Sequence, residues 1–317
     1  MAWRWTIGLL ALASVVICAS CAGLPASPGE GLEPPNESVV LATGIGAVSA
    51  LEIGDASVYA LMGPPASQVL RSVPVAGGAA SSLATGIVGA ESLAPVPGGC
   101  VYANSSDGNA YLATPGRAPE LVSKGFQGEV GPWVCSVGSV LCYARADGAG
   151  IASVGLSAPG GAGDGPVAPP QFLRFLGAAE GPELLAATES HVVFAHRNRA
   201  ELARMSRQGG GAVAMNKAIG SLVDVAAGGS HTIAAGTRGV VGDGRTLSSR
   251  SGVVAVAVAG DRLLYATESA VYEACAAGES LVATGQGITQ LAGAAGAVVF
   301  SDGASGGRLV RVTLTAD

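Results

Sequence analysis

The chain has 317 residues, 17 Lys and Arg against 23 Asp and Glu, and a formal net charge of -6. Such an acidic chain offers no basic surface for the phosphates of nucleic acid, so we exclude DNA and RNA as partners. The 49 glycines, the 17 prolines and an apolar fraction of 49% indicate many tight turns between apolar segments, which excludes disorder and long amphipathic helices.

Residues 1–20 have the pattern of an export signal peptide. Arg4 supplies a positive charge, and an uncharged apolar run from Ile7 to Ile17 follows it. This run is shorter than the roughly 20 residues that a membrane-spanning helix needs. The pattern therefore predicts export from the cytoplasm, to the periplasm or the cell surface.

The end of this segment, CASC from Cys18 to Cys21, resembles the lipobox of bacterial lipoproteins. The resemblance implies lipid attachment at Cys21. Cys18 stands where that family usually has Leu, Val or Ile, so ordinary cleavage near Ala22 is the alternative. Residues 21–37 are rich in Pro, Gly and Glu, as in a flexible tether between a membrane anchor and a folded domain. The outer membrane is one membrane that could carry this anchor.

Residues 38–317 contain an internal repeat. An aromatic residue between an aliphatic or Cys residue and a small one recurs as VYA, VYA, CYA, VFA, LYA and VFS, and a degenerate copy, IAA, begins at Ile233. The steps between copies are 43, 41, 51, 40, 31 and 35 residues. A repeat near 40 residues is typical of β-propeller blades and longer than most β-solenoid coils.

One copy, Glu91 to Gly125, shows the order of segments within a repeat. An apolar run, a Gly turn, the VYA run, an Asp-Gly turn and two further short runs follow one another. Asp-Gly after the second run recurs at Asp107, Asp147 and Asp302, where we expect the glycine to supply the positive φ of a tight hairpin. The sequence therefore predicts an all-β fold, a seven-bladed β-propeller of four-stranded antiparallel blades.

The two ends of the repeat region complement each other. The segment Val39 to Thr43 precedes the first full repeat and resembles the fourth strand of other copies, whereas the last repeat stops after its third strand, Arg308 to Thr315. We expect the N-terminal strand to complete the last blade and close the ring, since this hides two sheet edges.

The VYA and VFA repeats, with outer segments such as VLRSVPVAGG from Val69 to Gly78 and ELARMSRQGGG from Glu201 to Gly211, resemble the divergent propeller repeats of exported bacterial proteins. They are similar in plan to YWTD and TolB propellers. The resemblance covers about residues 38 to 317 and implies a fold, with no activity or site residue attached to it.

Cys135 and Cys142 flank a predicted two-residue turn at Gly138 and Ser139. Counting outward from this turn, residue 135 faces residue 142, and directly opposed Cα atoms lie within reach of a disulfide. Export makes a Cys135–Cys142 disulfide possible. The alternative is two reduced thiols that pack as small apolar residues.

Catalytic and metal-binding patterns are scarce. GASGG at Gly303 to Gly307 fits a nucleophile pattern, but it lies in a hairpin and no histidine follows it. No calcium loop and no nucleotide-binding glycine pattern occurs. We therefore assign no catalytic residue, no metal site and no cofactor. Acidic residues near inner strands, Glu52, Glu91, Glu189 and Asp224, have the scatter of ordinary strand-edge residues.

An arginine-rich hairpin is the candidate partner surface, with Arg197, Arg199, Arg204 and Arg207 as its members. It could bind a carboxylate-rich or phosphate-bearing partner, or it could be the solvated face of an outer hairpin. The leading interpretation is a monomeric, non-catalytic binding or scaffolding module, anchored by lipid outside the cytoplasm, whose partner is an exported protein or cell-envelope component. The alternative is a propeller hydrolase, lactonase or lyase that acts at the central funnel, which requires acidic or His side chains to converge there.

Overall fold

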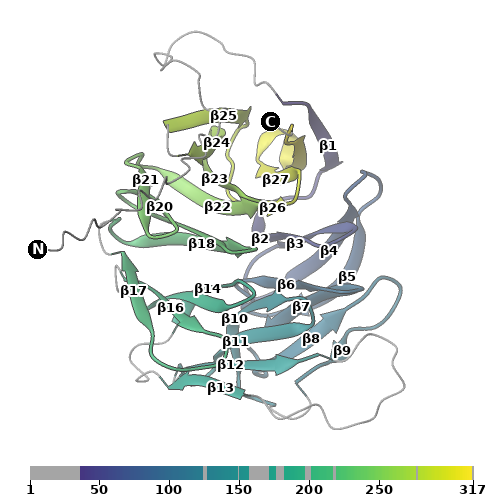
Figure 1. Cartoon of the computed structure of the whole chain (residues 1–317). Helices are drawn as coiled ribbons and strands as arrows, with labels where there is room; N and C mark the ends of the chain where they lie inside the picture. Colours follow the sequence, from purple (N-terminus) through teal and green to yellow (C-terminus); the bar gives the residue numbers. More distant parts are fainter. Residues whose placement is uncertain are drawn as a thin grey trace, which may run out of the picture.

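The computed structural model describes residues 36–123, 127–148, 150–156, 171–175, 182–196, 201–216, 219–275 and 278–315. The expected signal peptide and Cys21 lie outside these residues. In the described part, 28 strands form seven four-stranded antiparallel sheets, which stand in a ring (Figure 1). The predicted all-β, seven-bladed β-propeller is confirmed.

Each of the first six blades is built from four consecutive strands, ordered from the channel outward. The blades are β2 (Val48–Ile53), β3 (Ser57–Met62), β4 (Gln68–Pro74) and β5 (Ser81–Ile87); β6 (Leu93–Val96), β7 (Gly99–Asn104), β8 (Asn109–Ala113) and β9 (Glu120–Leu121); β10 (Val130–Val137), β11 (Val140–Arg145), β12 (Gly150–Gly155) and β13 (Gln171–Phe175); β14 (Pro182–Ala187), β15 (His191–His196), β16 (Leu202–Ser206) and β17 (Val213–Asn216); β18 (Leu222–Gly228), β19 (His231–Gly236), β20 (Gly239–Gly242) and β21 (Arg245–Ser248); β22 (Val253–Ala259), β23 (Arg262–Thr267), β24 (Ala270–Cys275) and β25 (Gly278–Thr284).

The seventh blade joins the two ends of the sequence. Its strands are β26 (Leu291–Ala294), β27 (Ala297–Asp302), β28 (Arg308–Thr313) and, outermost, β1 (Ser38–Thr43). β1 pairs antiparallel with β28, with Val39 opposite Arg311 and Thr43 opposite Arg308. Figure 1 shows purple β1 beside the yellow C-terminal strands. The predicted closure by the N-terminal strand is confirmed.

The repeated motif lies on the second strand of every blade, with its aromatic residue in all but β19, because that strand is packed on both faces. Alternate residues of a strand point to opposite sides of the sheet. On β7, Cys100 and Tyr102 pack toward the first blade, whereas Val101 and Ala103 pack toward the third. All four are buried. A large residue beside a small one therefore serves the two blade interfaces at once.

Seven apolar clusters hold the described residues together, and each lies between two neighbouring blades. The cluster that closes the ring contains Leu41 of β1, Leu51 and Val58 of the first blade, and Val299 and Leu309 of the last. The core is thus a ring of interfaces around the axis.

No helix of the described residues is long and apolar enough to cross a membrane.

One turn prediction is wrong. Gly108 and Gly148 adopt the expected positive φ, but Gly303 has a φ of -73°. The Asp302 carboxylate accepts a hydrogen bond from the Ala304 N–H at 2.8 Å and pairs with Arg308 at 2.7 Å. This buried ion pair draws the chain into a short 3-10 turn, η3 (Ala304–Gly306), so the positive φ falls later, at residues 305 to 307.

Candidate functional site

The inner strands of all seven blades surround a central channel with a cavity volume of about 150 Å³. Most of its lining is aliphatic, from Ala, Leu, Val and Gly residues. The polar and aromatic lining residues are Glu52, Glu91, Ser92, Trp133, Cys135, Ser136, Asp224 and Gln290. The channel is therefore a narrow space between mostly aliphatic residues, but the surface that faces the cavity is more polar than apolar.

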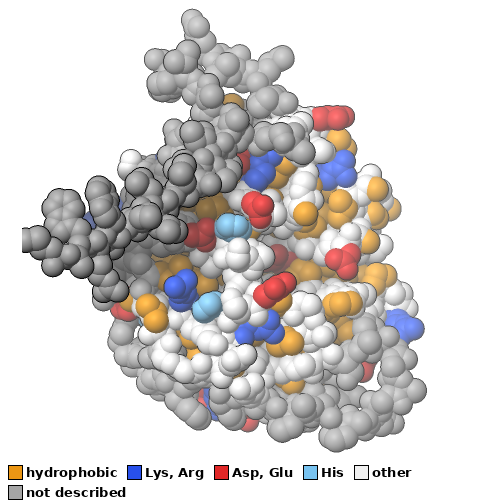
Figure 2. All heavy atoms as spheres, in the orientation of Figure 1, with side chains coloured by type: hydrophobic (Ala, Val, Ile, Leu, Met, Phe, Trp, Pro, Cys, Tyr) orange, Lys and Arg blue, Asp and Glu red, His pale blue; other side chains and the backbone are white. Residues whose placement is uncertain are grey.

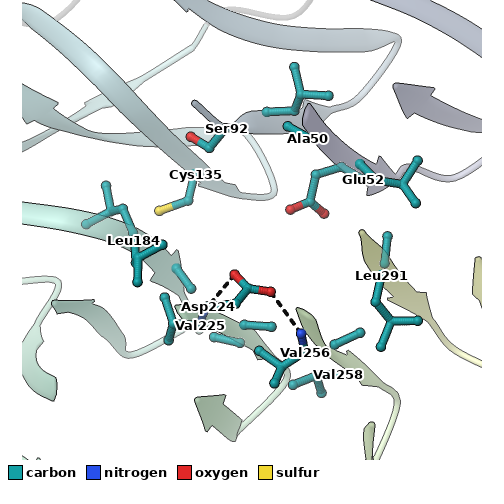
Figure 3. Close-up of a pocket in the computed structure, with 18 of the residues that line it drawn as sticks. Ala50, Glu52, Ser92, Cys135, Leu184, Asp224, Val225, Val256, Val258 and Leu291 are labelled. Carbon is teal, nitrogen blue, oxygen red and sulfur yellow. Dashed lines mark hydrogen bonds between the residues drawn. The ribbon is translucent and has the colours of Figure 1, made fainter. Parts of the chain in front are cut away.

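Asp224 on β18 ties its own blade to the next. Its Oδ1 accepts a hydrogen bond from the Val225 N–H and its Oδ2 accepts one from the Val256 N–H of β22, both at 2.8 Å (Figure 3). The register of β18 against β19 shifts between Leu222 and Asp224. Because such bulges turn a side chain away from its regular direction, this one helps to place the carboxylate at the joint between the blades.

Ser92, just before β6, links the second blade to the third in the same way. Its hydroxyl accepts a hydrogen bond from the Val134 N–H at 2.7 Å and donates one to the Val134 carbonyl at 2.8 Å. Ser136 donates to the Pro95 carbonyl in return. These polar lining residues satisfy backbone groups where inner strands of adjacent blades approach each other, so they stabilise the ring.

Glu52 on β2 has no such duty. Its carboxyl points into the channel, as Figure 3 shows, and the residue is only partly exposed. In the part of the chain that the structure describes, it forms no hydrogen bond and no ion pair. Glu52 is thus a channel carboxyl whose oxygens remain available.

Both carboxyls are easier to protonate than ordinary acidic residues. Burial, and then the nearby charge of Asp224, raises the pKa of Glu52 from 4.5 to about 8. Burial raises the pKa of Asp224 from 3.8 to about 7, although its two backbone hydrogen bonds act in the opposite direction. Near neutral pH both carboxyls therefore have a substantial protonated fraction.

The interpretation of the four acidic residues as ordinary strand-edge residues is wrong for two of them. Glu52 and Asp224 lie on innermost strands and meet in the channel, and Glu91 lines it from an exposed position just before β6. Glu189 lies apart, exposed in the turn between β14 and β15. The sequence signal was an acidic residue inside the apolar first run of a repeat, as in LEI and VDV.

Among the described residues, no group of three or more His, Cys, Asp or Glu is arranged to hold a metal ion. The lining of the channel also contains no Lys, Arg or His among the residues described. Glu52 and Asp224 consequently face no basic side chain in the described lining.

Cys135 and Cys142 lie directly opposite each other on β10 and β11, which confirms the predicted register. Gly138 at the turn has a φ of 56°. Both cysteines are free thiols here, and the disulfide stays a prediction. The pKa of the Cys142 thiol is lowered by a hydrogen bond from Cys135 and by Arg207. Cys135 also lines the channel (Figure 3).

The arginine-rich hairpin is only partly described. Arg197 and Arg199 lie outside the described residues. Arg204 is exposed on β16, and Arg207 donates a hydrogen bond to the Glu189 carbonyl at 2.9 Å. Figure 2 shows acidic and basic side chains interspersed over one face of the molecule. A partner surface at these arginines stays a prediction, and Arg207 has a structural role besides.

No known family and no curated protein matches the sequence. Solved structures match the fold. PorZ, an essential bacterial surface component of the type-IX secretion system of Porphyromonas gingivalis, is 12% identical with a TM-score of 0.54 over 88% of this chain. This chain spans only 39% of PorZ.

Two further propellers match over their whole length. Virginiamycin B lyase from Staphylococcus aureus, solved with quinupristin, is 11% identical with a TM-score of 0.58 and matches 89% of this chain and 100% of its own. YCF48, solved bound to a peptide, is 9% identical with a TM-score of 0.60 and matches 92% and 100%. At such identities the likeness shows the fold alone: this chain is a seven-bladed β-propeller with bacterial propellers among its structural neighbours.

Proposed function

We propose that the protein is a non-catalytic binding or scaffolding module, lipid-anchored at Cys21 outside the cytoplasm, which binds an exported protein or cell-envelope component at the mouth of its central channel. The size of the channel supports this most directly. Its cavity of about 150 Å³ is smaller than the roughly 300–1,000 Å³ of pockets that enclose drug-sized ligands. It suits one side chain of a partner better than a whole substrate.

The distribution of hydrogen bonds is a second support. Asp224, Ser92 and Ser136 are engaged with backbone groups of neighbouring blades. Groups fixed in this way keep a binding surface rigid, and rigid surfaces lose little entropy on association. YCF48 was solved bound to a peptide, which is an example of such a use on the same fold.

The experiment is site-specific photo-cross-linking in the producing cell. A photoreactive amino acid replaces Glu91, which is exposed and lines the channel. The matched control replaces Val213, which is 60% exposed on the outer strand β17. We expect a discrete cross-linked partner from position 91 and none from position 213. Partner contacts from position 213 alone, or from neither position, contradict the proposal.

The anchor is tested separately. Cys21→Ser should prevent lipid attachment and release the protein from the membrane fraction, and globomycin should block processing of the natural chain. Release of the variant and the natural chain in equal amounts contradicts the lipid anchor.

The two carboxyls favour a second candidate, a hydrolase, lactonase or lyase. Perturbed carboxyl pKa values in one cavity are typical of acid and base pairs, and Glu52 and Asp224 titrate near 8 and 7. Turnover of small lactones or esters that is lost in Glu52→Gln and retained in Glu189→Gln would establish this candidate over the first.

A further inference from the structure

We propose that the central channel binds a cationic nitrogen group, the ammonium or guanidinium of a partner's Lys or Arg side chain, with Glu52 as the carboxylate that receives it. The inference rests on the proposed binding function and adds the chemistry of the recognised group. Three separate observations carry it: an available carboxyl, an uncompensated pair of acidic groups and a cavity of matching size.

The available carboxyl is Glu52. Ser92 and Ser136 commit their hydroxyl hydrogens to the carbonyls of Val134 and Pro95, so neither can donate to it. Glu52 itself has no hydrogen-bonding partner among the described residues, yet it points into the cavity. A partly buried carboxylate without donors is costly. A ligand rich in N–H donors removes that cost.

The second observation is the charge. Asp224 uses one lone pair on each oxygen for a backbone N–H, which leaves further lone pairs toward the channel because a carboxylate has about four acceptor sites. No basic side chain occurs in the described lining. The two acidic groups therefore repel each other when ionised, and a single cation between them satisfies both.

Size and coordination select the kind of cation. A calcium ion requires about 6–8 oxygen ligands, and the described residues hold no group of three or more potential metal ligands. An ammonium group needs only about three acceptors. A cavity of about 150 Å³ has room for one extended basic side chain. Trp133 also lines the channel, and indole rings attract cations.

The test is titration calorimetry on the purified full-length chain at pH 8.5. The probes are n-butylammonium and n-propylguanidinium, which represent Lys and Arg side chains, and n-butanol, the neutral analogue. We expect both cations to bind and the alcohol not to bind. Glu52→Gln should weaken cation binding at least about tenfold, because a charge-assisted hydrogen bond is lost. Glu189→Gln, an exposed acidic residue outside the channel, should bind like the natural chain.

The pH dependence gives a readout that a change in overall structure would not reproduce. Cation affinity should increase from pH 6 to pH 9 as Asp224 and Glu52 lose their protons, with pKa values of about 7 and 8, while an alkylammonium stays charged because its pKa is about 10. Glu91 and Cys135 are the other titratable lining groups. In Glu52→Gln the increase should be confined to the range near pH 7. Equal melting temperatures of the variant and the natural chain at pH 5, where Glu52 is protonated, establish that the variant is folded.

The outcomes separate the inference from the proposed function. Binding of n-butanol as tightly as the cations, or undiminished cation binding by Glu52→Gln, overturns the inference. If cations fail to bind while position 91 still cross-links a partner, the inferred cation site is wrong and the proposed binding function is supported. If cations bind but no partner is cross-linked at position 91, the cation site is supported and the proposed binding of a partner at the mouth of the channel is wrong.

Discussion

Two walls of the central channel carry the same kind of residue for different purposes. Asp224 on β18 and Glu52 on β2 are both acidic, lie on innermost strands and have a raised pKa. The Asp224 carboxylate is bonded to backbone N–H groups of two blades, whereas the Glu52 carboxyl has no hydrogen bond among the described residues. Hydrogen-bond partners, more than charge or position, distinguish a structural carboxylate from an available one.

Removing β1, which completes the seventh blade, should lower the stability more than any single substitution in the channel. Deletion of residues 38–44 removes β1, exposes β28 and takes Leu41 out of the cluster that closes the ring. We expect the melting temperature to fall by more than about 10 °C, since several kcal/mol of pairing and burial are lost. Differential scanning calorimetry measures it. An unchanged melting temperature would show that the ring does not depend on β1.

Single substitutions test the comparison directly. Asp224→Ala leaves the N–H groups of Val225 and Val256 without their acceptor, which should cost about 2 to 3 kcal/mol at pH 6, below the pKa of about 7, where the cost of ionising this buried carboxyl does not offset the loss. Glu52→Ala breaks no hydrogen bond and should not destabilise the protein. Chemical denaturation of both variants gives the two values. Equal losses would contradict the division of roles.

Cys135 is a third residue of the channel lining, and it lies opposite Cys142 within its own blade. Oxidation to a Cys135–Cys142 disulfide closes a short hairpin loop and should stabilise the protein by about 2 kcal/mol. Alkylation and mass spectrometry of protein taken from the exporting cell determine whether the thiols are paired, and Cys135→Ser should reduce the effect of reductant on melting. Full alkylation of both thiols before reduction would establish the reduced pair.

Glu52 should also make the stability of the protein depend on pH. The pKa of Glu52 in the folded state, about 8, lies above the usual 4.5, so the folded state binds more protons than the unfolded state. The stability that Glu52 contributes is therefore complete below pH 4.5 and is lost as the pH rises through 8. Glu52→Gln should raise the melting temperature at pH 8.5 and leave it unchanged at pH 5. A variant with the same pH profile as the natural chain would place the titration elsewhere.

The fold was accessible from the sequence because its signal is repeated. The alternation of Tyr59, Tyr102 and their equivalents with small residues reports two packed faces on one strand, and the incomplete end repeats report the closure. The Cys135 and Cys142 register followed from the turn between them.

The site was less accessible because it depends on how distant strands converge. Glu52 and Asp224 lie in different repeats, and nothing local states that their strands share an axis. The Asp302 turn failed for a related reason. Its carboxylate is buried against Arg308, a contact that overrides the turn preference of the Asp-Gly pair.

The shared seventh blade has a consequence for the order of events during biogenesis. Synthesis proceeds from the N-terminus, so β1 emerges first and its partner β28 emerges last. The first six blades assemble from consecutive strands, but the final sheet waits for the arrival of the other end of the chain, and such distant pairing is slow. Throughout this interval, β1 is an unpaired strand whose Leu41, buried in the finished ring, is still open to water, and a nascent chain at this stage needs protection from its neighbours.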